Sequence, residues 1–390
     1  MSMNSSWMEL PAVWMRGGTS KCWIFDADRL AETDEPVEMI LNGAFGSGDA
    51  RQIDGVGGGS STTSKAMIVR RAGTGAIDVS YTFAQVGIAD RVVEWGSNCG
   101  NCASAVGLYA VQEGLVPPDG DETTVRMVNT NTGARLDAIV ATPNGRIPHL
   151  GPETIPGVST GGVPVRLRFA APLSGAGRSL LPTGEPRSVI ASAGRTVPAT
   201  IVDAGAMCSL VDAASLGLRG DEGIDRVGEV LEALVDIRRR SSVAAGLSRT
   251  IEEAQDAVPK VGMTAPPVDY FTTDGEPVSA ASYDLAVRMI SMHQPHPAIG
   301  LTSAVAVAVA ALTPGTIPYV QLAPGTPGTI RLGTPSGVVA VTVDFDDDGE
   351  VSGVSVNRSA RRLSTARLEI PRPPATHEVA PQYVQSVAMR

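Results

Sequence analysis

Two short segments rich in small apolar residues constrain the fold of this chain most. They span residues 103–113 and 302–312, and both carry alanine and valine on every side. A helix that is apolar all round has to be enclosed by other elements. Because the surrounding segments have the character of strands, the pattern predicts an α+β protein with two central, buried helices.

Alternating apolar and polar residues predict strands on both sides of each helix. The predicted strands span 11–15, 22–25, 66–71, 78–86, 123–129, 135–141, 163–169, 188–190, 196–202, 260–265, 329–332, 338–345 and 351–356. A further helix is predicted to begin at Asp284, and the basic stretch 358–372 is typical of a solvated edge strand.

The element order divides the chain into two related halves with a cleft between them. The boundary is predicted within the turn-rich stretch 170–187, which separates an N-terminal lobe, 1–182, from a C-terminal lobe, 183–390. The last segment, 371–390, is interpreted as a strand that is free to return to the first lobe.

Charge and apolar content exclude several classes of protein. The 390 residues carry a formal net charge of −10, and such an acidic chain lacks the cations that neutralise nucleic-acid phosphates. The longest apolar stretch, 298–312, is shorter than the ~20 residues that span a bilayer. The first residues show no basic region followed by an apolar one. We therefore expect a cytoplasmic protein without nucleic-acid or membrane partners.

The first candidate site is the turn RGGTSK between two predicted strands. Its glycines expose backbone N–H groups, Thr19 and Ser20 add hydroxyls, and Arg16 and Lys21 flank the turn with positive charge. These donors suit a carboxylate. An ordinary polar hairpin turn is the alternative.

A loop rich in Gly, Ser and Thr, residues 54–64, ends at Lys65. It lacks the G-x-x-x-x-G-K-[ST] pattern of a phosphate loop, so we do not expect a nucleotide. A lysine at the start of an apolar strand is partly desolvated, which favours the neutral amine and a role as general base. The alternative is a surface lysine.

The sequence NCGNC precedes the first small-residue helix. A cysteine at a helix N-terminus, such as Cys99, is stabilised as the thiolate, which predicts a lowered pKa. The same N–H groups bind anions. Cys99 and Cys102 form a C-x-x-C pair, but a zinc site needs a second ligand pair, and neither Cys22, Cys208 nor the four histidines supply one. We expect no metal.

The second small-residue helix also begins with hydroxyls, at Thr302 and Ser303, and Arg288 lies upstream of it. This arrangement mirrors the first helix. A cleft that faces two helix N-termini suits a di- or tricarboxylate. A simple helix N-cap is the alternative.

Seven motifs together resemble the PrpF family of 2-methylaconitate cis-trans isomerases, which also contains methylitaconate and oxalomesaconate isomerases. They are MRGGTSK, RQIDGVGGGSSTTSK, SNCGNCASAVG, VDAG, PKVGMTAPP, VRMISMHQPHPAIGLTSA and RLGTPSG. The resemblance covers nearly the whole chain. It implies a diaminopimelate-epimerase-like fold: two pseudo-symmetric lobes, each a β-sheet wrapped around a central helix, with the active site in the cleft between them.

The resemblance also implies roles for particular residues. Lys65 and Cys99 correspond to the acid/base pair, and Asn98, Gly100 and Asn101 to a carboxylate-binding turn. Further residues match cleft positions: Ser20, Ser64, Ser291, Met292, His296, Thr302 and Ser303. The chain departs from the family pattern at Cys22, Cys102, Cys208 and the pair Met292-His293.

These features predict an isomerase that needs no cofactor and shifts a double bond, or exchanges cis and trans forms, in an unsaturated di- or tricarboxylate. One alternative is an epimerase or racemase of the same fold, which requires a cysteine from each lobe, whereas the second lobe offers Thr302 and Ser303. A non-catalytic accessory protein that binds a carboxylate is the other. A homodimer is left open as the assembly.

Overall fold

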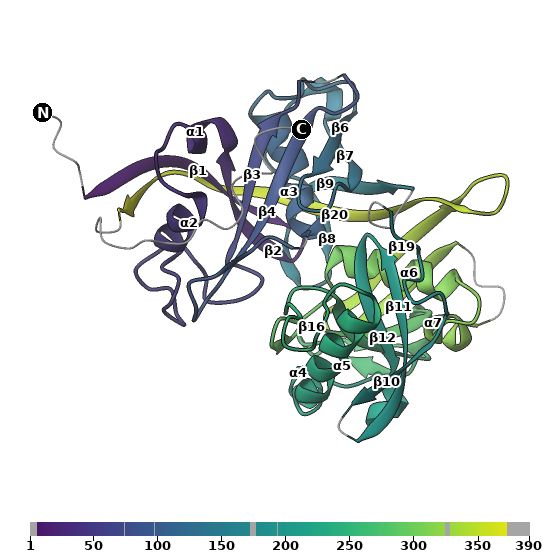
Figure 1. Cartoon of the computed structure of the whole chain (residues 1–390). Coiled ribbons are helices and arrows are strands. Elements are labelled where there is room, and N and C mark those ends of the chain that lie inside the picture. Colours follow the sequence, from purple (N-terminus) through teal and green to yellow (C-terminus); the bar gives the residue numbers. More distant parts are fainter. Residues whose placement is uncertain are drawn as a thin grey trace, which may run out of the picture.

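The computed structural model describes residues 6–73, 75–96, 98–171, 177–192, 194–323 and 328–372. The predicted α+β class is confirmed, and strands dominate the architecture (Figure 1). None of the helices in these ranges has the length and apolar character needed to span a membrane.

The elements of the first half surround α3. The strands are β1 (Trp7–Gly17), β2 (Ser20–Asp26), β3 (Lys65–Arg71), β4 (Val79–Val86), β5 (Val93–Glu94), β6 (Glu122–Asn129), β7 (Arg135–Ala141), β8 (Glu153–Ile155) and β9 (Val158–Ala170). The helices are α1 (Ala27–Ala31), α2 (Val37–Phe45) and α3 (Gly100–Gln112).

The elements of the second half surround α6. The strands are β10 (Ser188–Ser192), β11 (Arg195–Ala204), β12 (Ala206–Asp212), β13 (Lys260–Ala265), β14 (Tyr270–Phe271), β15 (Pro277–Val278), β16 (Leu285–Ser291), β17 (Gln294–Pro295), β18 (Thr329–Thr334), β19 (Gly337–Phe345) and β20 (Val351–Pro371). The helices are α4 (Ile224–Gly228), α5 (Leu231–Ala244), α6 (Leu301–Leu312) and α7 (Ile317–Gln321).

The two buried helices are confirmed. Every described residue of α3 except Gln112 is buried, and every residue of α6 except Leu312. Each helix packs against strands of its own half, both contact β20, and the two helices contact each other. One continuous hydrophobic cluster contains residues of both helices, so they form a shared core.

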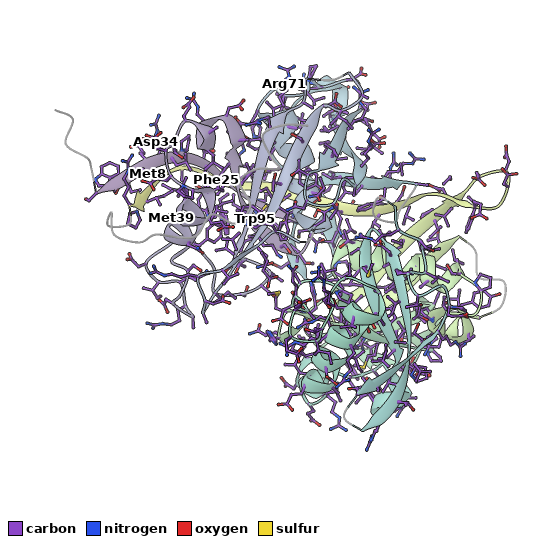
Figure 2. All side chains as sticks on the ribbon, viewed as in Figure 1. Met8, Phe25, Asp34, Met39, Arg71 and Trp95 are labelled. Atoms are coloured by element: carbon purple, nitrogen blue, oxygen red, sulfur yellow. The ribbon has the colours of Figure 1, made fainter. Side chains whose placement is uncertain are left out.

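A separate apolar cluster lies beneath α2, at the end of the molecule remote from α6. It includes Met8 and Phe25, both buried (Figure 2). This cluster anchors the outer end of β1 and includes Leu368 and Ile370, near the end of β20.

β20 joins the two halves and contains the stretch 358–372, for which the sequence predicts a solvated edge strand. It pairs with β19 at one end and with β1 at the other, and Ala360 faces both Gly17 of β1 and Val163 of β9. Among the described strands, residues 361–371 pair with β1 alone, and only Leu368 and Ile370 of them are buried, so the predicted edge is confirmed there. The prediction is wrong for residues 358–360, which are buried and pair with β9. The chain thus returns to the first half along β20, which pairs with β1 as far as Pro371. Most of the segment predicted to return, residues 373–390, lies outside the described residues.

The helix predicted from Asp284 is wrong. This segment is the strand β16, which pairs antiparallel with β13 and parallel with β18. Six of its seven residues are buried. A strand covered on both faces loses the apolar–polar alternation that identifies strands in a sequence. The predicted boundary near residue 182 falls between β9, which ends at Ala170, and β10, which begins at Ser188.

Candidate active site

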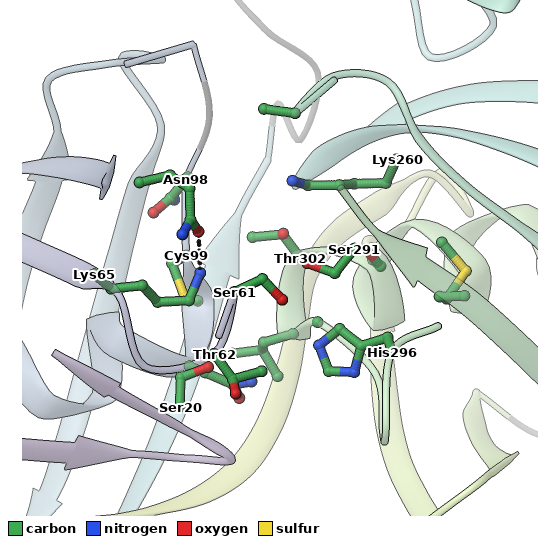
Figure 3. A pocket seen from close by; sticks show the side chains of 18 of the residues that line it. Ser20, Ser61, Thr62, Lys65, Asn98, Cys99, Lys260, Ser291, His296 and Thr302 are labelled. Carbon is green, nitrogen blue, oxygen red and sulfur yellow. Dashed lines mark hydrogen bonds between the residues drawn. The ribbon is translucent and has the colours of Figure 1, made fainter. Parts of the chain in front are cut away.

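A pocket lies where the N-termini of α3 and α6 meet (Figure 3). The two ends approach so closely that a Cβ on Gly100 would lie 2.8 Å from the Cβ of Leu301. Cys99 and Gly300 are the N-cap residues, and no side chain caps either helix. Free N–H groups and the positive ends of two helix dipoles therefore face the same space, which favours an anion.

Both halves of the chain line this pocket. The lining residues are Ser20, Ser61, Thr62, Lys65, Phe83, Gln85, Asn98, Cys99, Gly100, Asn101, Ala257, Lys260, Met289, Ile290, Ser291, Met292, His296, Gly300, Leu301, Thr302 and Ser303. Among these described residues are two lysines and neither aspartate nor glutamate. The protein as a whole has a negative net charge, whereas the charged side chains that line this pocket are positive.

Lys65 begins β3 and is fixed by its neighbours. Its Nζ donates a 2.6 Å hydrogen bond to Oε1 of Gln85 and lies 4.9 Å from the ring centre of Phe83. Gln85 is itself held, because its Nε2 donates to the carbonyl oxygen of Ser64 at 3.0 Å. The lysine side chain is only 8% exposed. Its amine is therefore presented to the pocket in one orientation.

Ser64 lies behind the pocket rather than in its lining. It is fully buried, and its Oγ donates to Oε1 of Gln52 at 2.5 Å. The same Gln52 oxygen accepts a hydrogen bond from the backbone N–H of Gly59. Gln52 thus closes the Gly, Ser and Thr loop on itself, and Ser64 supports the loop that delivers Lys65.

Cys99 lies at the N-terminus of α3 as predicted, but the expected lowering of its pKa is wrong. The hydrogen bond with Cys102, burial and the nearby Cys102 thiol raise the pKa of Cys99 well above the usual value, against the opposing charge of Lys65. Cys102 is fully buried, whereas Cys99 is partly exposed in the pocket. A protonated thiol at Cys99 is a proton donor, so the structure favours an acid here.

Asn98 and Asn101 present amides at the same helix end. Oδ1 of Asn98 accepts a 3.1 Å hydrogen bond from the Tyr81 hydroxyl, while its buried Nδ2 has no partner among the described residues. Nδ2 of Asn101 donates to Oγ1 of Thr19, and Oδ1 of Asn101 accepts from Nε of Arg358. The unpartnered Asn98 amide is a free donor for a ligand oxygen.

The turn RGGTSK supports α3 and contributes only Ser20 to the lining, which corrects the role expected for Arg16, Thr19 and Lys21. Arg16 is buried, and its Nη1 donates to the carbonyl oxygens of Gly18 and Ser359. Nζ of Lys21 lies 5.5 Å from the ring centre of Trp14. Gly18 has a φ of +52° and sits against Asn101, so the turn packs tightly on the helix end.

Arg288 is also outside the pocket, contrary to the prediction. Its side chain is 1% exposed, and its guanidinium donates to the carbonyl oxygens of Glu222, Val287 and Gly333. Glu222 and Gly333 come from distant segments of the second half, whereas Val287 precedes Arg288 in the chain. Arg288 therefore joins strands and loops of the core, and burial lowers its pKa.

His296 lines the second wall together with Ser291, Thr302 and Ser303. Burial, with the charges of Lys65 and Lys260, lowers the pKa of His296 to about 4. Nδ1 of the ring accepts a hydrogen bond from the backbone N–H of Ala298 at 3.0 Å. A neutral ring with Nδ1 as acceptor carries its proton on Nε2, which leaves Nε2 as a donor.

Met292 forms the rim of this wall in a left-handed backbone conformation, with a φ of 56°. Arg238, which is 1% exposed, donates from Nη1 to the carbonyl oxygen of Met292 at 2.7 Å. Asp256 accepts from Nη2 of Arg238 and contacts Nε2 of His293 at 2.6 Å. This network holds the rim.

Gln85 and Lys260 also line the pocket and can bind a ligand, although neither is predicted from the sequence. A signal for Lys260 was present, because it begins an apolar strand just as Lys65 does. Gln85 gave none, since it is one polar residue within β4. The described residues include no group of three or more His, Cys, Asp or Glu side chains that could hold a metal ion.

Several proteins of known activity are similar to this chain over nearly its full length. A 2-methyl-aconitate isomerase of Shewanella oneidensis is 34% identical over 94% of this chain and 98% of its own. A 3-methylitaconate isomerase of Eubacterium barkeri is 34% identical over 92% and 96%. A (4E)-oxalomesaconate Delta-isomerase of a Novosphingobium species is 33% identical over 90% and 95%.

Solved structures agree in fold. The crystal structure of a methylitaconate-delta-isomerase superposes with a TM-score of 0.78 at 32% identity, over 96% of this chain and all of the other. A probable proline racemase from Agrobacterium radiobacter gives a TM-score of 0.53 at 12% identity, over 92% of both chains, which is a likeness of fold alone. The family model described as PrpF protein matches residues 7–371. The chain therefore belongs to the PrpF family.

Proposed function

We propose that this chain is an isomerase that moves an allylic proton in an unsaturated di- or tricarboxylate with protein groups alone. The observation that carries the proposal is the pairing of Lys65 and Cys99 in one pocket whose described lining has no acidic side chain. An amine and a thiol supply base and acid, and the absence of carboxylates favours an anionic substrate.

In the proposed mechanism, Lys65 removes a proton from a carbon conjugated with a carboxylate. The negative charge spreads into a dienolate, which the free N–H groups of α3 and α6 and Nδ2 of Asn98 stabilise. The thiol of Cys99 then donates a proton at the other allylic carbon. Transfer of the first proton from Lys65 to the Cys99 thiolate restores both groups.

The substrate class follows the relatives, which are named for 2-methylaconitate, 3-methylitaconate and oxalomesaconate. All three are unsaturated carboxylates with at least two carboxyl groups. Rotation about the former double bond in the dienolate gives cis–trans exchange, and protonation at the distal carbon gives a double-bond shift. One pocket thus supports either outcome.

Epimerisation or racemisation is the alternative reaction for this fold. It needs a second acid/base thiol on the wall opposite Cys99. Among the described lining residues Cys99 is the single thiol, and α6 begins there with Thr302 and Ser303. The lining therefore supports isomerisation better. An accessory protein that only binds a carboxylate would have no use for the fixed Lys65.

The proposal includes the finer architecture. We take residues 1–182 and 183–390 as two pseudo-symmetric lobes, each a sheet around one of the helices α3 and α6, with substrate bound between them. A cytoplasmic location and a homodimer belong to the same proposal. Crosslinking and sedimentation of the purified protein test the dimer.

Turnover of a panel of unsaturated carboxylates tests the function. The panel holds 2-methylaconitate, cis- and trans-aconitate, 3-methylitaconate and oxalomesaconate, and ultraviolet absorbance follows the conjugated double bond. Proton NMR in deuterated buffer identifies the product. Isomerisation of at least one compound is expected, with incorporation of deuterium at an allylic carbon. Inversion of a saturated stereocentre without movement of a double bond would contradict the proposal.

A further inference from the structure

Lysine is rare in this chain, and its distribution is uneven. Of the 31 Lys and Arg residues, three are lysines: Lys21, Lys65 and Lys260. Two of these three, Lys65 and Lys260, line the same pocket. Because all the other residues of this set are arginines, composition alone does not account for a second lysine here.

Lys260 enters the pocket from the second half of the chain. It is the first residue of β13, and its side chain points across the pocket from the wall opposite Lys65 (Figure 3). Lys65 is held by Gln85. Lys260, by contrast, has no hydrogen bond or ion pair with any residue that the structure describes. Its ammonium is therefore available to a ligand.

Charged and titratable groups around Lys260 do not neutralise it. The nearby charge of Lys65 disfavours the protonated form of Lys260, whereas Glu94, Cys99 and Cys208 favour that form. Burial raises the pKa of Glu94, and Oε2 of Glu94 is buried without a partner among the described residues. His296 stays neutral between the two lysines because its pKa is lowered to about 4. Among the residues that the structure describes, none forms an ion pair with the partly buried Lys260 ammonium, so a bound anion can supply the counter-charge.

We propose that Lys260 binds a carboxylate of the substrate that takes no part in proton transfer, at the end opposite Lys65 and Cys99. This inference rests on the proposed function and narrows its substrate class. The carboxylate conjugated with the reacting carbons is held near Lys65 by the helix N–H groups and Asn98, while Lys260 lies on the opposite wall. A substrate therefore has to carry at least two carboxylates to use both sites. A monocarboxylate would cover the partly buried Lys260 ammonium without pairing it, which disfavours its binding.

The titration of Lys260 makes the proposal testable without losing the fold. Burial, followed by the charge of Lys65, lowers the pKa of Lys260 to about 8. If the bound carboxylate requires the protonated amine, affinity falls about tenfold between pH 7 and pH 9. Arginine remains charged over this whole range, so Lys260→Arg removes the titration but keeps the charge.

The experiment measures binding of tricarballylate, a saturated tricarboxylate that cannot isomerise, by calorimetry between pH 7 and pH 9. For the wild type we expect the dissociation constant to rise about tenfold over this range. For Lys260→Arg we expect a dissociation constant that stays constant with pH. Lys260→Met should bind at least about tenfold more weakly than wild type at pH 7 and show no titration.

Two results would overturn the assignment of Lys260. One is the same pH dependence in Lys260→Arg as in the wild type, and the other is wild-type affinity in Lys260→Met at pH 7. Turnover of the unsaturated panel is measured separately. Lys260-dependent binding without turnover leaves this inference standing and refutes the proposed reaction. Turnover with Lys260-independent binding refutes only this inference.

Discussion

At the scale of single residues, Cys99 shows how neighbouring thiols change the chemistry of a helix N-terminus. The helix dipole by itself would stabilise a thiolate, yet Cys102 and burial outweigh it and raise the pKa of Cys99. A thiol that keeps its proton at neutral pH complements an amine that accepts one. Lys65 and Cys99 thus divide the roles of base and acid in the proposed mechanism.

Alkylation tests the state of Cys99 directly. Iodoacetamide should modify Cys99 before Cys22, Cys102 and Cys208, because only Cys99 is partly exposed. The rate should be slow at pH 7 and rise through pH 9, since alkylation requires the thiolate and the pKa is raised. Tricarballylate should protect the residue. Mass spectrometry of tryptic peptides measures each site, and faster modification of Cys102 would contradict this account.

At the scale of elements, the close approach of α3 and α6 creates the pocket. Both helices start without a side-chain cap, and Gly100 permits their ends to meet. A second glycine of α3, Gly107, also sits tightly, since a Cβ there would lie 2.4 Å from the Cβ of Ala138. Gly107 faces β7, away from the pocket, so it offers a matched control.

Gly100→Ala should weaken tricarballylate binding about tenfold or more by pushing the two helix ends apart. Gly107→Ala should leave the dissociation constant within about twofold. Both variants should lose about 1–3 kcal/mol of unfolding free energy, because each adds a methyl group to a packed contact. Calorimetry and thermal unfolding separate the two effects. Equal affinity in the two variants would show that the helix ends do not bind the ligand.

How far the sequence predicts these elements depends on how local their signals are. The helices α3 and α6 could be predicted because small apolar residues on every side identify a buried helix. Lys65 and Cys99 could be singled out because each lies directly beside the segment that presents it. Lys65 follows the loop rich in Gly, Ser and Thr, and Cys99 precedes α3. The strand β16 could not be recognised, since burial on both faces removes alternation.

The structural roles of Arg288 and Arg358 depend on contacts with distant parts of the chain. Arg288 could not be distinguished from a ligand-binding arginine, because the carbonyl groups that hold it belong to Glu222 and Gly333 as well as to its neighbour. Arg358 was interpreted as part of a solvated edge, whereas it is buried and bonded to Asn101. Contacts between residues so far apart in sequence have no local signature.

At the scale of the whole molecule, an acidic protein encloses a pocket with two lysines. The described lining of the pocket contains none of the acidic side chains that give the chain its net charge of −10, so local groups can attract anions there. β20 ties the two halves together by pairing with β1, β9 and β19. Substrate bound between the N-termini of α3 and α6 would contact both halves at once.

The proposed proton transfers use only Lys65 and Cys99, so activity should not depend on an added metal or nicotinamide. Exhaustive dialysis against a chelator should leave the turnover number within about twofold of the untreated enzyme. Ultraviolet absorbance on the best substrate of the panel measures this. Loss of turnover that one divalent metal restores would contradict a mechanism based on protein groups alone.

The proposed mechanism depends most on removal of the allylic proton by Lys65. Its most direct test is the exchange of that proton with deuterated solvent, followed by proton NMR in the wild type and in Lys65→Met. We expect Lys65→Met to abolish exchange while tricarballylate affinity stays within about tenfold, or about 1.4 kcal/mol. Exchange at the wild-type rate in Lys65→Met would show that another group is the base and would contradict the mechanism.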